Sequence, residues 1–244
     1  MTSTTPATLQ RRAEDLQRAL GAIATGHAPA VLASSLGAED MVLTDAILGN
    51  GIAIEIFTLD TGRLHPETLS VLERVRARYG YDVRVYRPHA DAVDRYVGEL
   101  GLDAIYRSVE LRRRCCEIRK VEPLARALAG KAAWVTGLRR AQSVTRADLP
   151  LQEFEPAHGL WKFNPLAEWS ERDVWDYLRS RDVPYNPLHD RGFRSIGCAP
   201  CTRPTAAGED LRAGRWWWED AQTKECGLHK PSVEATDAQP GLLR

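Results

Sequence analysis

The chain has 244 residues with 33 basic and 33 acidic side chains, so its formal net charge is zero. Without a global field that would draw the protein to nucleic acid or an anionic membrane, any bound anion must be held by a local cluster of cations. A hydrophobic content of 43% and a charged content of 27% are typical of a soluble globular protein. No apolar run has the length of a membrane span, and the N-terminus lacks the pattern of a signal peptide. We therefore expect a cytoplasmic protein without structural disulfides.

Strand and helix patterns alternate over the first third of the chain. Pro66 opens one helical pattern, as proline often does at a first helical position, and Gly49 and Gly51 close another. The expected elements are a helix over 9–23, a strand over 30–33, a helix over 38–48, a strand over 52–59, a helix over 66–79 and a strand over 83–86. This alternation predicts an α/β fold with a mostly parallel sheet and helices on both faces.

The remaining chain is predicted to contain helix, one further strand and loops. Residues 90–129 have a helical pattern, and residues 132–136 have the pattern of a strand. Ser170 and Asp173 form a capping box that starts another helix, and the stretch after Asn186 predicts loops and short helices. No internal repeat is present. We expect a single domain over residues 1–230, including its N-terminal helix, and a flexible tail over residues 231–244.

Four of the five cysteines form two pairs. Cys115 and Cys116 are adjacent, and Cys198 and Cys201 form a C-x-x-C motif. Soft thiolates are typical ligands of zinc and of iron–sulfur clusters. Adjacent cysteines on a helix diverge, which suits a bulky cluster better than one small ion. A zinc site that only stabilises the fold, and buried inert thiols, remain alternative interpretations.

The fifth cysteine, Cys226, stands alone near the C-terminus, and His229 follows three residues later. A thiol beside a mobile tail can reach an active site and leave it, and the histidine would favour the thiolate or contact an anion. An ordinary surface cysteine beside a surface histidine fits the same residues. A lone cysteine therefore does not decide between these interpretations.

Two loops that follow predicted strands carry residues suited to bind an anion. Ser34, Ser35 and Gly37 join a strand to a helix, where backbone N–H groups can face a phosphate. This loop lacks the Gly-Lys-Ser/Thr of a Walker A motif. Thr61 and Gly62 end the next strand, at the edge of a parallel sheet where ligands bind. A simple helix cap and a plain turn are the alternative interpretations.

Cations gather near the cysteines although the chain as a whole is neutral. Arg139 lies in a basic loop after the strand over 132–136, and Lys120 follows the first cysteine pair. Arg212 and Arg215 follow the second pair. Any one of these cations could pair with a local carboxylate. The group favours an anionic ligand or cluster, because arginine suits phosphate and sulfate and cations tune an iron–sulfur cluster.

Taken in order, the motifs are similar to those of one enzyme family. The matching stretches are residues 37–40 (GAED), 59–68 (LDTGRLHPET), 115–121 (CCEIRKV), 136–140 (TGLRR), 198–204 (CAPCTRP), 214–218 (GRWWW) and 225–229 (ECGLH). The chain resembles assimilatory adenylyl-sulfate (APS) reductases, within the wider phosphoadenylyl-sulfate reductase family. Each stretch alone is a weak signal, whereas the ordered set is specific.

The resemblance implies a fold, a cofactor and site residues. The fold would be the α/β fold of the adenine-nucleotide α-hydrolases, with a 4Fe–4S cluster as the cofactor. Cys226 matches the nucleophile of the family. The matching cluster ligands are Cys115, Cys116, Cys198 and Cys201. The residues that match positions holding the phosphosulfate are Lys120, Arg212, Arg215 and His229.

The resemblance also implies a reaction. It is the reduction of adenylyl sulfate to sulfite and AMP through an enzyme S-sulfocysteine, in sulfate assimilation toward cysteine. Thioredoxin or glutaredoxin would supply the electrons. No nucleic acid or membrane partner is expected. A homo-oligomer is compatible with the sequence, which does not set the oligomeric state.

One position departs from the family pattern, and other functions stay open. Leu36 stands where the family loop commonly has a serine, so a hydroxyl contact is missing there. A reductase of the 3′-phosphorylated substrate (PAPS) is the nearest alternative, and the two cysteine pairs favour APS because PAPS-using relatives usually lack the cluster. More remote alternatives are an ATP-pyrophosphatase-type enzyme and a non-enzymatic redox sensor. Residues 34–40 lack the pyrophosphate loop that the former needs.

Overall fold

The computed structural model describes residues 5–143, 146–220, 224 and 227–228. Its centre is a six-stranded sheet in the order β3-β2-β1-β4-β6-β5. The strands are β1 (Ala30–Ala33), β2 (Ile54–Leu59), β3 (Arg84–Tyr86), β4 (Ala133–Val135), β5 (Gln152–Glu155) and β6 (Leu160–Phe163). All neighbours pair in parallel except β5, which pairs antiparallel with β6 at one edge. The predicted α/β fold with a mostly parallel sheet is confirmed.

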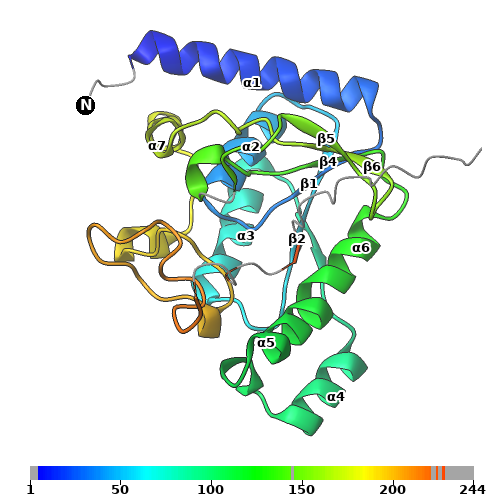
Figure 1. Ribbon diagram of the computed structural model, residues 1–244. Helices are drawn as coiled ribbons and strands as arrows, with labels where there is room; N and C mark the ends of the chain where they lie inside the picture. The colour runs from blue at the N-terminus through cyan, green and yellow to red at the C-terminus, as the bar shows by residue number, and fades with distance from the viewer. Residues whose placement is uncertain (1–4, 144–145, 221–223, 225–226, 229–244) are drawn as a thin grey trace, which may run out of the picture.

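Helices cover both faces of the sheet (Figure 1). The α-helices are α1 (Pro6–Gly26), α2 (Ala38–Leu48), α3 (Pro66–Tyr79), α4 (Ala90–Leu100), α5 (Val109–Cys116), α6 (Glu122–Leu128) and α7 (Glu171–Ser180). Alternate residues of β1 divide between the faces, as the period of a strand requires. Leu32 joins the core formed with α1, α2, α3 and α7, whereas Val31 packs with α6 on the other face. Among the described residues, no helix is long and apolar enough to cross a bilayer.

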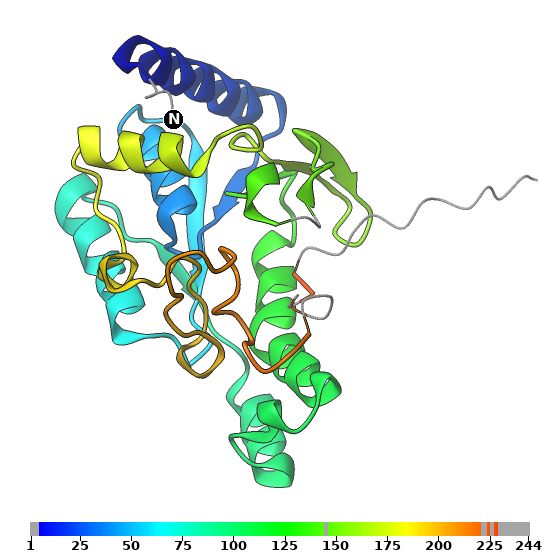
Figure 2. The same cartoon turned by 60° about the vertical axis from the view of Figure 1, so that its left-hand side comes forward.

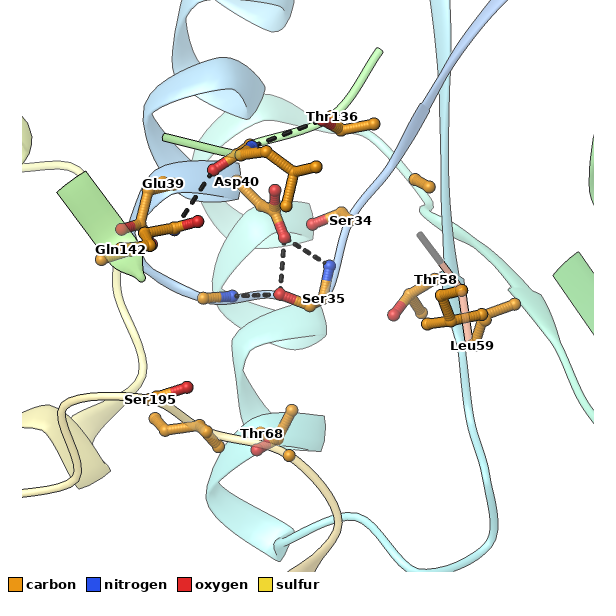
Figure 3. A pocket seen from close by; sticks show the side chains of 18 of the residues that line it. Ser34, Ser35, Glu39, Asp40, Thr58, Leu59, Thr68, Thr136, Gln142 and Ser195 are labelled. Carbon is orange, nitrogen blue, oxygen red and sulfur yellow. Dashed lines mark hydrogen bonds between the residues drawn. The ribbon is translucent and has the colours of Figure 1, made fainter. Parts of the chain in front are cut away.

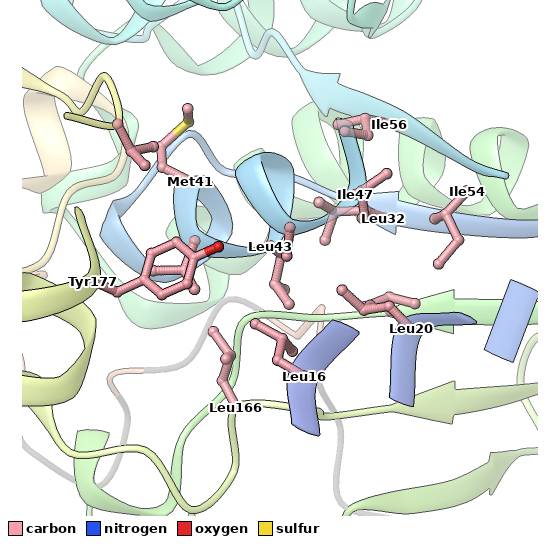
Figure 4. Packing of buried hydrophobic residues seen from close by; sticks show 14 of the residues in the cluster. Leu16, Leu20, Leu32, Met41, Leu43, Ile47, Ile54, Ile56, Leu166 and Tyr177 are labelled. Carbon is pink, nitrogen blue, oxygen red and sulfur yellow. The ribbon is translucent and has the colours of Figure 1, made fainter. Parts of the chain in front are cut away.

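The larger core explains why several elements have the predicted bounds. Figure 4 shows Leu16 and Leu20 of α1 packed with Leu43 and Ile47 of α2 over strand residues such as Leu32. Almost every residue of α2 is buried, because this helix lies between the sheet and α1. The bounds of β1, α2 and α3 agree with the prediction. The β5–β6 hairpin was not predicted.

The predicted helical region over 90–129 is interrupted at residues 101–108, and its second part contains an irregular turn beside the first cysteine pair. The vicinal cysteines end α5, and a π-helical turn, Glu117–Val121, joins α5 to α6. Such turns are rare and occur frequently at functional sites, because they re-aim the side chains around them. Here the turn carries Arg119 and Lys120 next to the two cysteines.

The carboxyl ends of β1, β2 and β4 meet at one edge of the sheet. After β1 the chain forms β2 and β3 on one side of that strand, and it later forms β4 on the opposite side. This reversal of strand order is a topological switch point, where open α/β sheets bind ligands. Asp40 secures the loop after β1, since its Oδ2 accepts hydrogen bonds from the Ser35 backbone N–H and hydroxyl at 2.6 Å each. Burial raises the pKa of Asp40 to about 6, although the Ser35 bonds oppose this shift.

The raised pKa of Asp40 predicts a pH-dependent stability. The pKa of this carboxyl group is higher in the folded protein than its ordinary value of 3.8, so the protonated group favours the folded state. Its contribution to the free energy of unfolding is complete below pH 3.8 and is lost as the pH rises through about 6. The free energy of unfolding of the wild type minus that of Asp40→Asn should fall by roughly 2 to 3 kcal/mol from pH 4 to pH 7. Urea denaturation across this range measures the difference. A difference that stays constant with pH would contradict the assignment.

Gly137 in the loop after β4 allows that loop to approach α2. A Cβ atom at Gly137 would collide with the Asp40 carboxylate and lie 3.0 Å from the Glu39 Cβ. Gly137→Ala should therefore destabilise the protein by about 1 to 3 kcal/mol in thermal or urea unfolding. Gly98→Ala is the matched control, because nothing lies within 4 Å of a Cβ at this exposed helical position. Equal stability of the two variants would refute the close packing.

Candidate active site

The loop after β1 presents backbone groups at the start of α2. Gly37 is the N-cap of this helix, and the Ser34 and Ser35 hydroxyls accept hydrogen bonds from the N–H groups of Leu36 and Gly37 at 3.2 and 3.4 Å. The helix dipole and the N–H groups of the first turn favour an anion here. Figure 3 shows Ser35 bonded to Asp40 at the wall of a cavity.

Leu36 faces away from this cavity. Its backbone has a positive φ of 60°, and its side chain is 1% exposed within the larger core. It is not one of the residues that line the cavity, whereas Ser34, Ser35 and Gly37 are. The missing hydroxyl at this position is thus replaced by an apolar side chain that anchors the loop in the core.

The loop after β2 connects the sheet to the second cysteine pair. The Thr61 hydroxyl lies 3.2 Å from Cys198 Sγ, and the Thr61 carbonyl accepts a hydrogen bond from Arg119 at 2.7 Å. The Arg63 carbonyl accepts a hydrogen bond from the Ala199 backbone N–H at 2.8 Å. Gly62 has a positive φ of 69° and forms the turn, but it does not line the cavity itself. One short loop therefore joins the sheet edge to both cysteine pairs.

The large cavity at the switch point has walls of two kinds. Phe57, Leu59, Leu124 and Trp134 give it an apolar side, which suits a flat ring system. The lining also includes five cations and, at the start of α2, the carboxylates of Glu39 and Asp40; the cations are Lys120, Arg146, Arg194, Arg212 and Arg215. A ligand that combines an aromatic base with anionic groups matches this division.

The two cysteine pairs come together around a second, smaller cavity, which we call the cysteine cavity. All four thiols are buried, at 6 to 9% exposure, and none forms a disulfide. The cavity is lined by Arg63, Ile105, Arg112, Cys115, Cys116, Arg119, Lys120, Cys198, Pro200, Cys201 and Trp216. In Figure 2, the segment that carries the second pair, drawn in yellow to orange, lies beside α5 and α6. Four soft ligands and four cations thus surround one buried space.

Electrostatics distinguish the thiols. Burial, and then the neighbouring Cys198, raise the pKa of Cys201 to about 12, and burial raises the pKa of Cys115. Burial also acts on Cys198, but Lys120 and the Thr61 hydroxyl outweigh it and lower the pKa of that thiol. Four thiolates cannot ionise side by side without compensating positive charge. Among the described residues, no three His, Cys, Asp or Glu side chains are grouped so as to hold a single metal ion.

Two residues line both cavities. Lys120 comes from the π-helical turn, and Trp216 comes from the loop after the second cysteine pair. Trp216 is 1% exposed with a positive φ of 41°. These two side chains form the wall that separates the cavities.

Two described residues of the C-terminal segment, Lys224 and Leu228, lie at or next to the large cavity. The Lys224 carbonyl accepts a hydrogen bond from Arg212 at 3.0 Å. Leu228 lines the cavity and packs against the apolar cluster of β1, β2 and α6. Cys226 and His229 themselves lie outside the described residues, so their roles stay predictions.

The sequence-predicted residues whose positions the structure describes divide into three groups, apart from Gly62, which lines neither cavity. Those that line the large cavity are Ser34, Ser35, Gly37, Thr61, Lys120, Arg212 and Arg215. Arg139 lies elsewhere, because it is buried and donates to Glu39 at 2.7 Å and to the Trp169 carbonyl at 3.3 Å. The third group, the four paired cysteines, lines the cysteine cavity.

Several cavity residues were not found from the sequence. His189 lines the large cavity, and burial lowers its pKa, which favours the neutral imidazole. Arg194 and Ser195 also line it, just before the C-x-x-C motif. Their position beside that motif was the available signal. The contribution of Trp134, on β4, depends on strand order and had no signal in the sequence.

Comparison with known proteins finds one family that matches most of the chain. Residues 29–204 match the model of the family described as phosphoadenosine phosphosulfate reductase domain. The chain is 60% identical over 225 residues to the adenosine 5′-phosphosulfate reductase of Burkholderia cepacia, with 92% of this chain and 90% of the relative covered. It is 54% identical to the adenosine 5′-phosphosulfate reductase of Neisseria meningitidis serogroup B, with 91% of each chain covered.

Solved structures confirm the predicted fold. The phosphoadenylyl-sulfate reductase of Candida auris superposes with a TM-score of 0.65 at 26% identity, covering 83% of this chain and 99% of that one. The FMN adenylyltransferase of Candida glabrata shares the fold alone, with a TM-score of 0.56 at 16% identity over 96% of this chain and 78% of the other. The family match, the close relatives and the shared fold together show that this chain belongs to the phosphoadenosine phosphosulfate reductase family.

Proposed function

We propose that the protein reduces adenosine 5′-phosphosulfate (APS) to sulfite and AMP, with a thioredoxin-type dithiol as electron donor, in sulfate assimilation toward cysteine. The observation that carries this proposal is the pair of cavities that share Lys120 and Trp216 as a wall. The apolar side of the large cavity suits adenine, and its cations suit a phosphosulfate. The names of the relatives at 54 and 60% identity support APS as the substrate.

The first step transfers the sulfuryl group to the enzyme. Free sulfate resists nucleophiles, but in APS the sulfur is joined through a bridging oxygen to AMP, which can leave. The Cys226 thiolate attacks this sulfur, the bond from sulfur to the bridging oxygen breaks, and AMP departs with the electron pair. Cys226 then carries an S-sulfo group. Lys120, Arg212, Arg215 and His229 offset charge on the sulfuryl oxygens and the departing phosphate.

The second step releases sulfite. A thiolate of the dithiol attacks Sγ of Cys226, and sulfite leaves with the electrons of the sulfur–sulfur bond. The second thiol of the dithiol resolves the mixed disulfide, so one dithiol supplies both electrons and ends as a disulfide. Support for a role of Cys226 at the cavity comes from its described neighbours in the chain, because Leu228 lines the cavity and the Lys224 carbonyl accepts a hydrogen bond from Arg212, which also lines it. We place this thiol chemistry in the cytoplasm, where thiols stay reduced.

We further propose that the cysteine cavity holds a 4Fe–4S cluster. The donor set fits, because four buried thiols line one space together with Arg63, Arg112, Arg119 and Lys120. A cluster ligated by four thiolates is anionic overall, which suits cations such as Arg119 and Lys120, whereas Arg112 is already neutralised by Glu219. When bound, the cluster supplies fixed charge and links α5 to the segment carrying the C-x-x-C motif. The reducing electrons come from the dithiol.

Cys226→Ser should lower sulfite release from APS by roughly a thousandfold or more, because a serine hydroxyl cannot form the S-sulfo intermediate. Intact-mass spectrometry with APS and no dithiol should show a sulfo adduct on the wild-type chain and none on the variant. Cys226→Ser should still bind ADP, an unreactive analogue of APS. An adduct on another cysteine would contradict the role of Cys226. Faster turnover of the 3′-phosphorylated nucleotide than of APS would contradict the proposal that APS is the substrate.

Anaerobically purified protein should contain about four iron atoms and four acid-labile sulfides per chain. Cys201→Ser should lose most of this iron, because it removes one of the four proposed ligands, whereas Cys226→Ser should retain it. Iron, sulfide and zinc analyses together with the visible absorption spectrum measure the outcome. Stoichiometric zinc without sulfide would exclude the cluster.

A further inference from the structure

A buried ion pair lies behind the wall that separates the two cavities. Arg112 is fully buried and donates to Glu219 from Nε to Oε1 at 2.9 Å and from Nη2 to Oε2 at 2.7 Å. The Glu219 side chain is 3% exposed, so both charges are removed from water. Such a two-point pair has a defined geometry, and removing either partner leaves an uncompensated buried charge.

Trp216 connects this pair to the large cavity. The Arg112 guanidinium lies 4.6 Å from the centre of the Trp216 ring, and the Arg215 guanidinium lies 4.5 Å from it. The Glu219 backbone N–H donates to the Trp216 carbonyl at 2.8 Å, which closes a turn that brings the carboxylate back to Arg112. Arg112 lines the cysteine cavity, and Arg215 lines the large one.

Arg215 has few other constraints on its position. Its Nη1 donates to the Ile196 carbonyl at 3.2 Å, while its buried Nε has no hydrogen-bond partner. Among the described residues, no carboxylate forms an ion pair with Arg215, although its side chain is largely buried. A Cβ at Gly197 would lie 2.6 Å from the guanidinium carbon, so only glycine leaves room for this side chain.

A buried arginine without a carboxylate has a strong tendency to bind an anion. Two guanidinium groups lie over the Trp216 ring, and because Glu219 neutralises Arg112, Arg215 is the one of the two whose charge is not offset by a carboxylate of the described residues. The face of the indole ring then fixes the plane of the guanidinium, since a cation prefers the ring face. The direction in which the Arg215 guanidinium faces the large cavity therefore depends on where the Arg112–Glu219 pair holds the Trp216 indole ring.

We propose that Arg112 and Glu219 are positioning residues for Arg215, and that they act through Trp216. Arg215 in turn binds the terminal sulfuryl end of the nucleotide, an assignment that rests on the proposed function. Neither positioning residue touches the substrate. Their effect should therefore be confined to ligands that carry an anionic group beyond the first phosphate.

The test compares the equilibrium binding of ADP and AMP by calorimetry. ADP has a second phosphate where APS has its sulfuryl group, and AMP lacks it. Glu219→Gln should raise the Kd of ADP about tenfold and change that of AMP less than twofold, with a similar rise in KM for APS. Glu209→Gln is the matched control, because Glu209 forms a half-exposed pair with Arg203 on the same segment and should change neither Kd.

A double-mutant cycle separates positioning from general stability. In an Arg215→Ala background, Glu219→Gln should have no further effect on ADP binding. Arg112→Lys keeps the charge but loses the planar stack, and should reproduce the selective loss of ADP if Glu219→Gln does not fold. Thermal unfolding and iron content show whether each variant is intact.

Equal weakening of ADP and AMP, or additive effects in the Arg215→Ala background, would overturn the inference. Unchanged ADP binding by Glu219→Gln would also overturn the inference. If the wild-type protein still released sulfite from APS, the proposed function would not be affected by that result. Absence of sulfite release from the wild type would refute the proposed function instead, whatever the nucleotide binding.

Discussion

The wall formed by Lys120 and Trp216 is the feature on which the rest of the site depends. It separates a cavity lined by apolar and cationic side chains from a buried space lined by four thiols. Charges on one side act on the other across a single side chain, where screening by water is weak. This coupling already appears in the thiols, because Lys120 and the Thr61 hydroxyl lower the pKa of Cys198 against the effect of burial.

The local excess of cations explains how a neutral chain can bind a highly charged ligand. Most arginines at the surface have carboxylate neighbours, as in the pairs formed by Arg126 with Glu122 and Arg203 with Glu209. Arg215 differs, because it is held by an indole ring and a carbonyl instead of a carboxylate. A cation that is not neutralised in the folded protein retains its capacity to bind an anion, and family membership indicates that the anion is a nucleotide of activated sulfate.

Much of the fold could be predicted from local patterns. The strand over 30–33 and the helices over 38–48 and 66–79 have the predicted bounds, because apolar runs, Pro66 and flanking glycines act within a few residues. The first helix extends further, from Pro6, since Thr5 caps it and contact with the core is not needed at every turn. The β5–β6 hairpin was not predicted, because its strands are four residues long and mix charged with aromatic side chains.

By itself, the sequence determined the family, the α/β class and which cysteines form pairs, since these depend on residue type and spacing. Only the tertiary structure decided which cations line the large cavity. Arg139 and Arg215 both follow recognisable motifs, yet Arg139 is neutralised by Glu39 and Arg215 lines the cavity. The physical reason is that the partner of a charged side chain is set by distant residues brought together on folding. Glu39 is 100 residues from Arg139 in the chain, and no local pattern encodes that meeting.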